Sequence, residues 1–188
     1  MHTIHLIGIS GSLRQGSSNT AVLRALQEAL PPSVSMTLLP LDDVPLYNQD
    51  LDTAEPPAGV RAFKQAIGAC DGIVICSPEY NFGMPGVLKN ALDWASRPAF
   101  ASPLKGKPVL LMTASPAFTG GVRAQANLRE ALSGTLARVL ARPPVVIGAV
   151  HTKITNGRLT DAASLDFALA AVQDLAAEVR LLRGAAAA

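Results

Sequence analysis

The chain has 188 residues, of which 49% are hydrophobic and 16% charged, and its formal net charge is only +2. This length suffices for one core, so we expect a single domain over residues 1–188. The basic residues form no tract that would mark a nucleic-acid or membrane partner, and no run reaches the roughly 18 apolar residues of a membrane span, so we expect a soluble protein.

The first half of the chain alternates apolar runs with helical spacing. Residues 4–9 predict a buried strand that ends in a loop, and residues 19–30 predict a helix that Pro31 and Pro32 stop. Residues 34–39 predict a second strand, and a proline-rich loop follows it. The next helix is expected over residues 60–69.

The second half continues the alternation. Residues 73–76 predict a strand without polar alternation, which is typical of a parallel sheet covered on both faces. Helices are expected at residues 87–95, 123–140 and 166–182, and strands at residues 108–113 and 145–150. In the third helix, Leu88, Leu92 and Trp94 are interpreted as packing residues. The alanine-rich tail after Gly184 is expected to fray.

Five strands alternating with five helices predict an α/β fold with a doubly wound, five-stranded parallel sheet and helices on both faces. In such sheets, ligands bind beyond the carboxyl ends of the strands, near the point where the strand order reverses. We therefore expect the site in the loops at residues 10–20, 77–86 and 114–122.

The loop after the first strand reads S-G-S-L-R-Q-G-S-S-N-T and runs into a helix. The N–H groups at a helix N-terminus suit a phosphate, and Arg14 would add a charge-assisted bond. The loop contains neither the GK[ST] of a P-loop nor G-x-G-x-x-G. Two alternatives stay open: the polar residues only cap the helix, or Asp42 and Asp43 after the second strand hold a dinucleotide ribose.

The loop after the third strand reads S-P-E-Y-N-F-G-M-P-G. Tyr80 and Phe82 offer planar apolar surface, while Glu79, Asn81 and the peptide groups offer hydrogen bonds, a combination that suits a flavin ring. As alternatives, Glu79 is a general acid or base, which no nearby histidine supports, or the two aromatic residues belong to the core. The loop after the fourth strand, A-S-P-A-F-T-G-G, consists mostly of small residues. It would either pass close to the flavin ring or only connect the strand to the next helix.

Cysteine and histidine give no sign of metal or disulfide chemistry. Cys70 and Cys76 have the spacing of neither a redox pair nor a zinc site, and we interpret them as buried free thiols. Free thiols fit a reducing compartment, and the start of the chain does not read as a secretory signal, so we expect a cytoplasmic protein. His2, His5 and His151 are too dispersed to predict a metal site.

The motifs G-S-L-R-x-G-S-x-N, S-P-E-Y-N-x-x-x-P-G-x-L-K-N-A-x-D-W-x-S-R and the Gly120–Gly121 pair resemble the NADPH-dependent FMN reductase family, which includes quinone, chromate and azo-dye reductases. The resemblance covers residues 4–150. It implies a flavodoxin-like fold, one FMN per subunit, NADPH or NADH as co-substrate, and homodimers or homotetramers with the flavin near a subunit interface.

The resemblance also assigns roles to individual residues. The phosphate and ribityl end would be held by Ser10, Arg14, Ser17, Ser18, Asn19 and Thr20. The isoalloxazine would be lined, mainly through backbone groups, by Pro78, Glu79, Tyr80 and Asn81. The flavin would be approached from the next loop by Ser115, Gly120 and Gly121.

The chain departs from the family pattern after the Gly–Gly pair. Family members often carry an aromatic residue or a histidine in this stretch, where Ala126 and Asn127 stand here. The departure concerns the subunit interface and the acceptor preference that the resemblance implies, and it leaves the implied flavin site unchanged.

The implied function is an FMN-dependent NAD(P)H oxidoreductase that reduces small acceptors such as quinones, flavins, azo compounds or chromate by ping-pong hydride transfer. The flavin would carry the chemistry, so no catalytic side chain is expected. The rival interpretations are a flavodoxin-type electron carrier, a flavin-binding sensor without catalysis, and an NAD(P)-binding oxidoreductase without flavin. The mildly basic composition and Arg14 argue against the carrier, because flavodoxins tend to be acidic.

Overall fold

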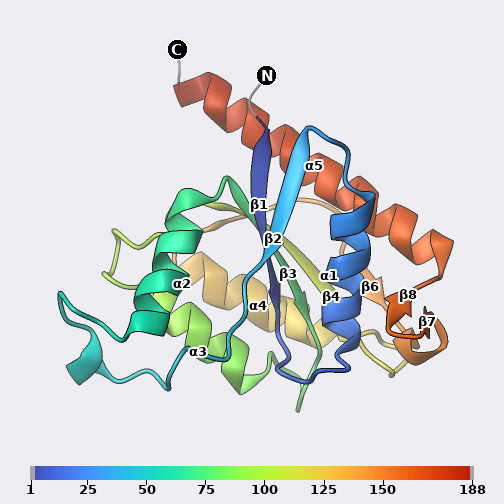
Figure 1. Cartoon of the computed structure of the whole chain (residues 1–188), viewed down its shortest axis with the longest axis horizontal. Coiled ribbons are helices and arrows are strands. Elements are labelled where there is room, and N and C mark those ends of the chain that lie inside the picture. The colour runs from blue at the N-terminus through green and yellow to red at the C-terminus, as the bar shows by residue number, and fades with distance from the viewer. Residues whose placement is uncertain (1–2, 187–188) are drawn as a thin grey trace.

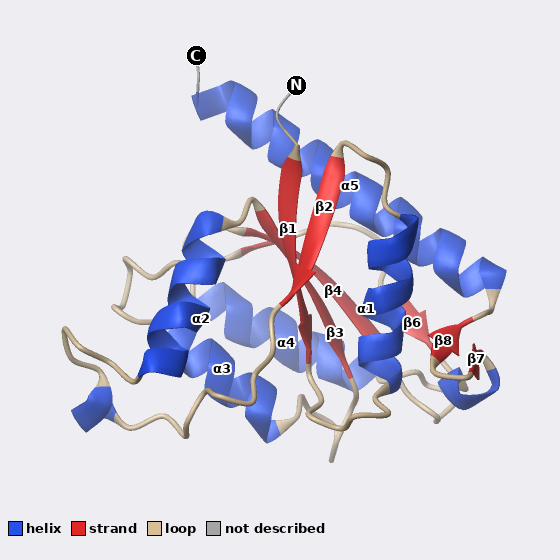
Figure 2. Ribbon diagram, viewed as in Figure 1, coloured by secondary structure: helices blue, strands red, loops and turns tan. Residues whose placement is uncertain are grey.

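The computed structural model describes residues 3–186 and is built on a central parallel sheet (Figure 1, Figure 2). Its strands are β1 (Ile4–Ser10), β2 (Val34–Leu38), β3 (Gly72–Ser77), β4 (Pro108–Ala114), β5 (Arg138–Val139) and β6 (Val145–Ile147). The strand order is β2-β1-β3-β4-β5, and β6 also pairs with β4. This is the order of flavodoxin-like doubly wound sheets, so the predicted fold class is confirmed.

Helices cover both faces of the sheet (Figure 2). They are α1 (Ser18–Ala29), α2 (Ala58–Ala69), α3 (Gly86–Ala95), α4 (Val122–Gly134) and α5 (Ala162–Ala186). One buried cluster joins the sheet to α1 and α5 through residues such as Leu23 and Leu175. A second cluster joins the other face to α2, α3 and α4 through residues such as Phe63 and Leu128.

The central strands end together at one edge of the sheet. Every residue of β3 and β4 is buried, as the lack of polar alternation in β3 predicts. Ser10 pairs in register with Cys76, and Ser77 pairs with Thr113. The loops after β1, β3 and β4 therefore begin at the same edge.

The stretch between α4 and β6 differs from the prediction of one long helix to residue 140. The helix ends at Gly134, and Leu136 has a φ of 63°, which turns the chain back toward the sheet. Residues 138–140 then run alongside β4, and the Leu140 N–H donates to the Val109 carbonyl at 2.9 Å. Pro143 and Pro144 cannot donate and separate the short strand β5, which was not predicted, from β6, so the sheet has six strands instead of the expected five.

Two further boundaries differ near the C-terminus. The strand predicted to residue 150 ends at Ile147, because Ala149 has a φ of 49° and leads into the short 3-10 helix η2 (Val150–Thr152). A small hairpin, β7 (Ile154–Thr155) and β8 (Arg158–Leu159), follows.

The last helix begins earlier than predicted, since Asp161 caps it: its Oδ1 accepts from the Ser164 N–H at 2.9 Å. Residues 185–186 are helical rather than frayed, and the rest of the expected frayed tail lies outside the described residues. Within residues 3–186, no helix is long and apolar enough to cross a membrane.

The proline-rich loop after β2 is hydrogen-bonded to α3. It contains the short 3-10 helix η1 (Gln49–Leu51). Trp94 is fully buried, as expected of a packing residue, and its Nε1 also donates to the Pro45 carbonyl at 2.8 Å. Asn90 accepts from the Tyr47 N–H at 2.7 Å and donates to the same carbonyl at 2.9 Å. Asn90 and Trp94 of the K-N-A-x-D-W stretch therefore hold this loop in place.

Candidate functional site

A cavity of about 250 Å³ opens where the loops after β1, β3 and β4 meet. The predicted site residues that line it are Arg14, Ser17, Ser18, Asn19, Pro78, Glu79, Tyr80 and Ser115. Its wall is completed by Ser12, Ala114 and Pro116, which the sequence did not single out. The available signal for Ser12 was its hydroxyl inside the S-G-S-L-R stretch.

The first turn of α1 offers backbone donors to this cavity. Ser17 caps the helix, because its Oγ accepts from the Thr20 N–H at 3.3 Å. The backbone N–H groups of Ser18 and Asn19 donate to no protein acceptor in the part of the chain that the structure describes. Both residues line the cavity, so the helix end can bind an anion there as well as being capped.

Arg14 adds positive charge at the rim of the cavity. Its Nη2 donates to the carbonyl of Gly16 at 3.1 Å, which leaves other guanidinium donors free. Among residues 3–186, no carboxylate forms an ion pair with it. An anion in the cavity would thus meet a charged donor that no other protein group neutralises.

Asn19 joins the strands beneath the cavity. Its buried side chain donates to the Ala114 carbonyl at 3.2 Å and accepts from the Cys76 thiol at 3.2 Å. Burial raises the pKa of Cys76 far above its usual range, so the thiol stays protonated and can donate. Burial also raises the pKa of Cys70, although nearby Lys107 opposes this shift. Both cysteines are free and buried, as predicted.

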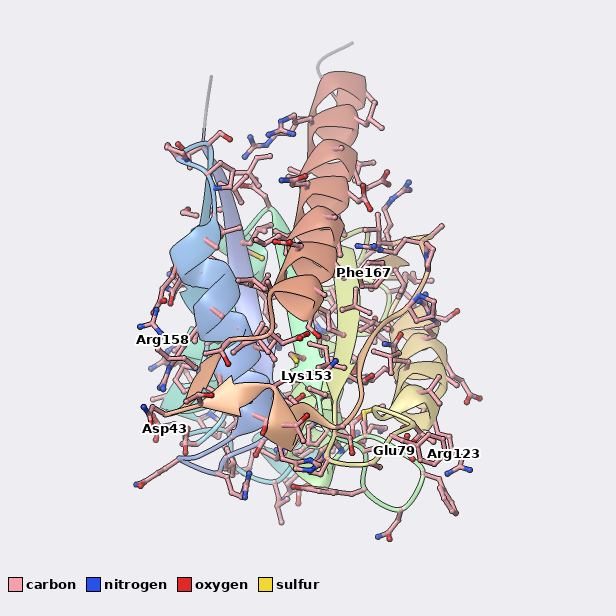
Figure 3. All side chains as sticks on the ribbon, turned by 90° about the vertical axis from the view of Figure 1, so that its right-hand side faces the viewer. Asp43, Glu79, Arg123, Lys153, Arg158 and Phe167 are labelled. Atoms are coloured by element: carbon pink, nitrogen blue, oxygen red, sulfur yellow. The ribbon has the colours of Figure 1, made fainter. Side chains whose placement is uncertain are left out.

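The Glu79 carboxylate is hydrogen-bonded to the N-terminus of α4. Its Oε2 accepts from the backbone N–H groups of Arg123 and Ala124 at 2.8 and 3.2 Å. The Arg123 guanidinium lies 3.7 Å from Oε1, and Figure 3 shows these two side chains next to each other. A carboxylate at a helix N-terminus compensates the orphan donors and the helix dipole. This arrangement favours a capping role over general acid–base chemistry.

The aromatic residues after β3 lie on a tight exposed turn. Tyr80 and Gly83 exchange two backbone hydrogen bonds of 3.0 Å, while Asn81 and Phe82 have φ values of 48° and 68°, the pattern of a type I′ turn. Tyr80 and Phe82 are 55% and 69% exposed, so the interpretation as core residues is wrong. Phe82 stacks against Arg123, whose Cζ is 4.3 Å from the ring centre. Left-handed backbone at a bulky residue is strained, and such strain is common at ligand sites.

The other predicted site residues do not line this cavity, and Asn81 is one of them. Ser10 and Thr20 hydrogen-bond to each other at 2.9 Å and face a neighbouring cavity. Gly120 has a φ of 61°, and a Cβ there would lie 2.4 Å from Val146 Cγ1; Gly121, with a φ of 88°, is the N-cap of α4. The two glycines thus let their loop pack closely on β6 and start α4.

The chain is similar to known proteins over most of its length. The model of the NADPH-dependent FMN reductase family matches residues 4–152. An NAD(P)H-dependent FMN reductase of Pseudomonas aeruginosa is 40% identical over 96% of this chain and 98% of its own length. A quinone reductase of Escherichia coli K12 is 41% identical over 87% of this chain and 88% of its own.

A solved structure is similar over nearly the whole chain. The flavoenzyme NAD(P)H:(acceptor) oxidoreductase FerB from Paracoccus denitrificans superposes with a TM-score of 0.82 at 30% identity, covering 95% of this chain and 98% of that one. The similarity therefore includes α5, which lies beyond the residues that the family model matches.

Proposed function

Because the chain belongs to the NADPH-dependent FMN reductase family, we propose that it binds FMN at the cavity between its three loops and passes a hydride from NAD(P)H to a small acceptor such as a quinone. Family membership makes it an FMN- and NAD(P)H-dependent oxidoreductase. The observation that carries the site assignment is the meeting of the α1 donors, Arg14 and the loop after β3 at one cavity.

The residues present suit the phosphate end of FMN. The N–H groups of Ser18 and Asn19, the Ser17 hydroxyl and the Arg14 guanidinium supply the donors that a phosphate dianion needs. The cavity is smaller than the roughly 300–1,000 Å³ of typical ligand pockets. It therefore fits the phosphate and ribityl end, and the ring would extend outside it, toward the exposed turn at residues 80–83.

The turn after β3 suits the ring end. Pro78 and Tyr80 line the cavity there, and Tyr80 and Phe82 are both exposed. Bound FMN supplies the hydride chemistry, while the protein binds and orients the flavin. With Glu79 held by α4, we assign no acid–base side chain to the reaction, and Asn81, Ser115, Gly120 and Gly121 would support the flavin through loop backbone.

We also assign the domain organisation, the oligomeric state and the location of the protein. We assign the whole chain to one FMN-binding domain, since α5 supplies part of the core beside β1 and β3. Exposed apolar residues near the site, Tyr80, Phe82 and Phe118, suit a homodimer or homotetramer with the flavin near the subunit interface. The two free cysteines fit a reducing, cytoplasmic location.

Initial rates measured at varied NADPH and varied benzoquinone test the proposed reaction. If the reductant and the acceptor use one site in turn, double-reciprocal plots give parallel lines. Intersecting lines would contradict the shared site, and no turnover with benzoquinone, free FMN, an azo dye or chromate would contradict the activity itself.

A further inference from the structure

A second, larger cavity lies beside the proposed flavin site, on the other side of the loop after β1. Its volume is about 420 Å³, within the range of typical ligand pockets. It opens between the carboxyl ends of β1 and β2 and the first turns of α1. The two cavities share Ser12 and Arg14, so ligands bound in both would lie against the same short segment.

The lining of this second cavity combines an apolar wall with charged groups. Leu13, Leu38 and Leu41 contribute to the apolar side, which suits a flat ring. Arg14, Arg24 and Asp42 contribute the charges, two positive and one negative. A ligand that satisfies all of them carries a ring, hydroxyl donors and at least one phosphate.

Arg24 is available to such a ligand. Its neighbour one turn along α1, Glu28, is already paired with Arg158 of β8, which Figure 3 shows beside α1. Arg24 itself has no ion pair with any carboxylate of residues 3–186. Asp42 likewise has no partner in the described chain, and it follows β2, where doubly wound dinucleotide-binding sheets place an acid that accepts from a ribose hydroxyl.

We propose that this second cavity binds the adenosine phosphate half of the reduced nicotinamide dinucleotide. The leucines pack against the adenine, Asp42 accepts from the ribose, and Arg24 and Arg14 bind the phosphates. This inference rests on the proposed function, because the other half of the same molecule must reach the flavin. It adds the residues that recognise the reductant, which the flavin site itself does not contain.

The test uses the full chain loaded with FMN and the variant Arg24→Gln. The matched control is Arg180→Gln, an exposed α5 arginine at the amino end of the sheet and without an ion pair among the described residues. Binding of 5′-AMP and of 2′,5′-ADP is measured by calorimetry. Michaelis constants are compared for NADPH, NADH and reduced nicotinamide mononucleotide, which lacks the adenosine half.

We expect Arg24→Gln to weaken binding of at least one adenosine phosphate and to raise the KM of the matching dinucleotide by roughly tenfold or more, the usual effect of losing a charge-assisted bond. The KM for reduced nicotinamide mononucleotide and the FMN content should not change, and Arg180→Gln should behave as wild type. The ligand with the larger effect identifies the preferred dinucleotide.

The inference would be overturned if neither adenosine phosphate bound while NADPH still reduced the flavin, or if Arg24→Gln left both Kd and KM unchanged. An equal rise in KM for reduced nicotinamide mononucleotide would also overturn it, because the effect would then not come from the adenosine half. If none of NADPH, NADH and reduced nicotinamide mononucleotide reduced the bound flavin, the proposed function would fail together with the inference.

Discussion

At the carboxyl end of β1, Arg14 and the first turn of α1 present the charge that an incoming phosphate would meet. The Arg14 guanidinium has only the Gly16 carbonyl as a hydrogen-bond partner within the described chain. A residue held so loosely contributes little to folding, so its replacement should act on ligand affinity rather than on stability.

Replacing Arg14 with glutamine should therefore raise the dissociation constant for FMN by about 10- to 100-fold, the effect of losing a charge-assisted bond of roughly 1.5–3 kcal/mol. The quenching of flavin fluorescence on titration of the apoprotein measures this constant. Arg180→Gln serves as the control for the loss of one positive charge. Equal affinity in the Arg14 variant and the wild type would show that the phosphate lies elsewhere.

Glu79 gives a prediction that separates capping from catalysis. Because its carboxylate accepts from two N–H groups of α4, Glu79→Gln should lower the free energy of unfolding by about 1 kcal/mol. Denaturant unfolding measures the loss. The pH profile of kcat/KM should keep its shape, and disappearance of one limb of that profile would identify Glu79 as an acid or base after all.

At the scale of elements, the sequence predicts the buried strands well and the stretch after α4 poorly. Strong apolar runs specify β1, β3 and β4, and helical spacing specifies α1 to α3, because both patterns follow from burial. The long helix prediction failed beyond Gly134, where the chain turns through Leu136 at positive φ and pairs with β4. That pairing is a tertiary contact, and only Gly134 and the two prolines signalled it locally.

For the candidate site too, the sequence predicts some features well and others poorly. The three loops could be assigned from the sequence, since the carboxyl ends of parallel strands share one edge. The direction of each side chain could not be predicted from the sequence. Glu79 hydrogen-bonds to the N-terminus of α4, and the Thr20 hydroxyl donates to the Ser10 hydroxyl. Such details depend on neighbours that are distant in sequence, as the separation of 44 positions between Glu79 and Arg123 illustrates.

The start of α5 carries a prediction about pH. Hydrogen bonds from the Ser164 side chain and backbone hold the pKa of Asp161 below its usual value, and Lys153 acts in the same direction. A depressed pKa means that the ionised carboxylate stabilises the fold above the usual aspartate pKa of about 3.9, and that this contribution is lost as the pH falls through the lower folded value.

The variant Asp161→Asn should therefore melt at a lower temperature than the wild type at pH 7, and the difference should close in acid, well below the usual aspartate pKa. Thermal melts followed by circular dichroism across this range measure it. Asp93→Asn, which removes an exposed pair with Lys89, provides the control and should change little at pH 7. A difference between Asp161→Asn and the wild type that stayed constant down to low pH would show that the charge is not involved.

For the whole molecule, the doubly wound topology explains the position of the candidate site. Helices α1 and α5 cover one face of the sheet and α2, α3 and α4 the other (Figure 1). The carboxyl edge is left open, and both the proposed flavin cavity and the proposed adenosine cavity lie there. The exposed turn at residues 80–83 extends from the same edge.

The measurement that tests the central claim most directly is the visible absorption spectrum of the purified protein under anaerobic conditions, before and after addition of NADPH. The account predicts an oxidised-flavin spectrum, from bound or added FMN, that bleaches rapidly when NADPH is added. A flavin spectrum that neither NADPH nor NADH changes would contradict the oxidoreductase function, and a colourless protein that takes up no FMN would contradict the site itself.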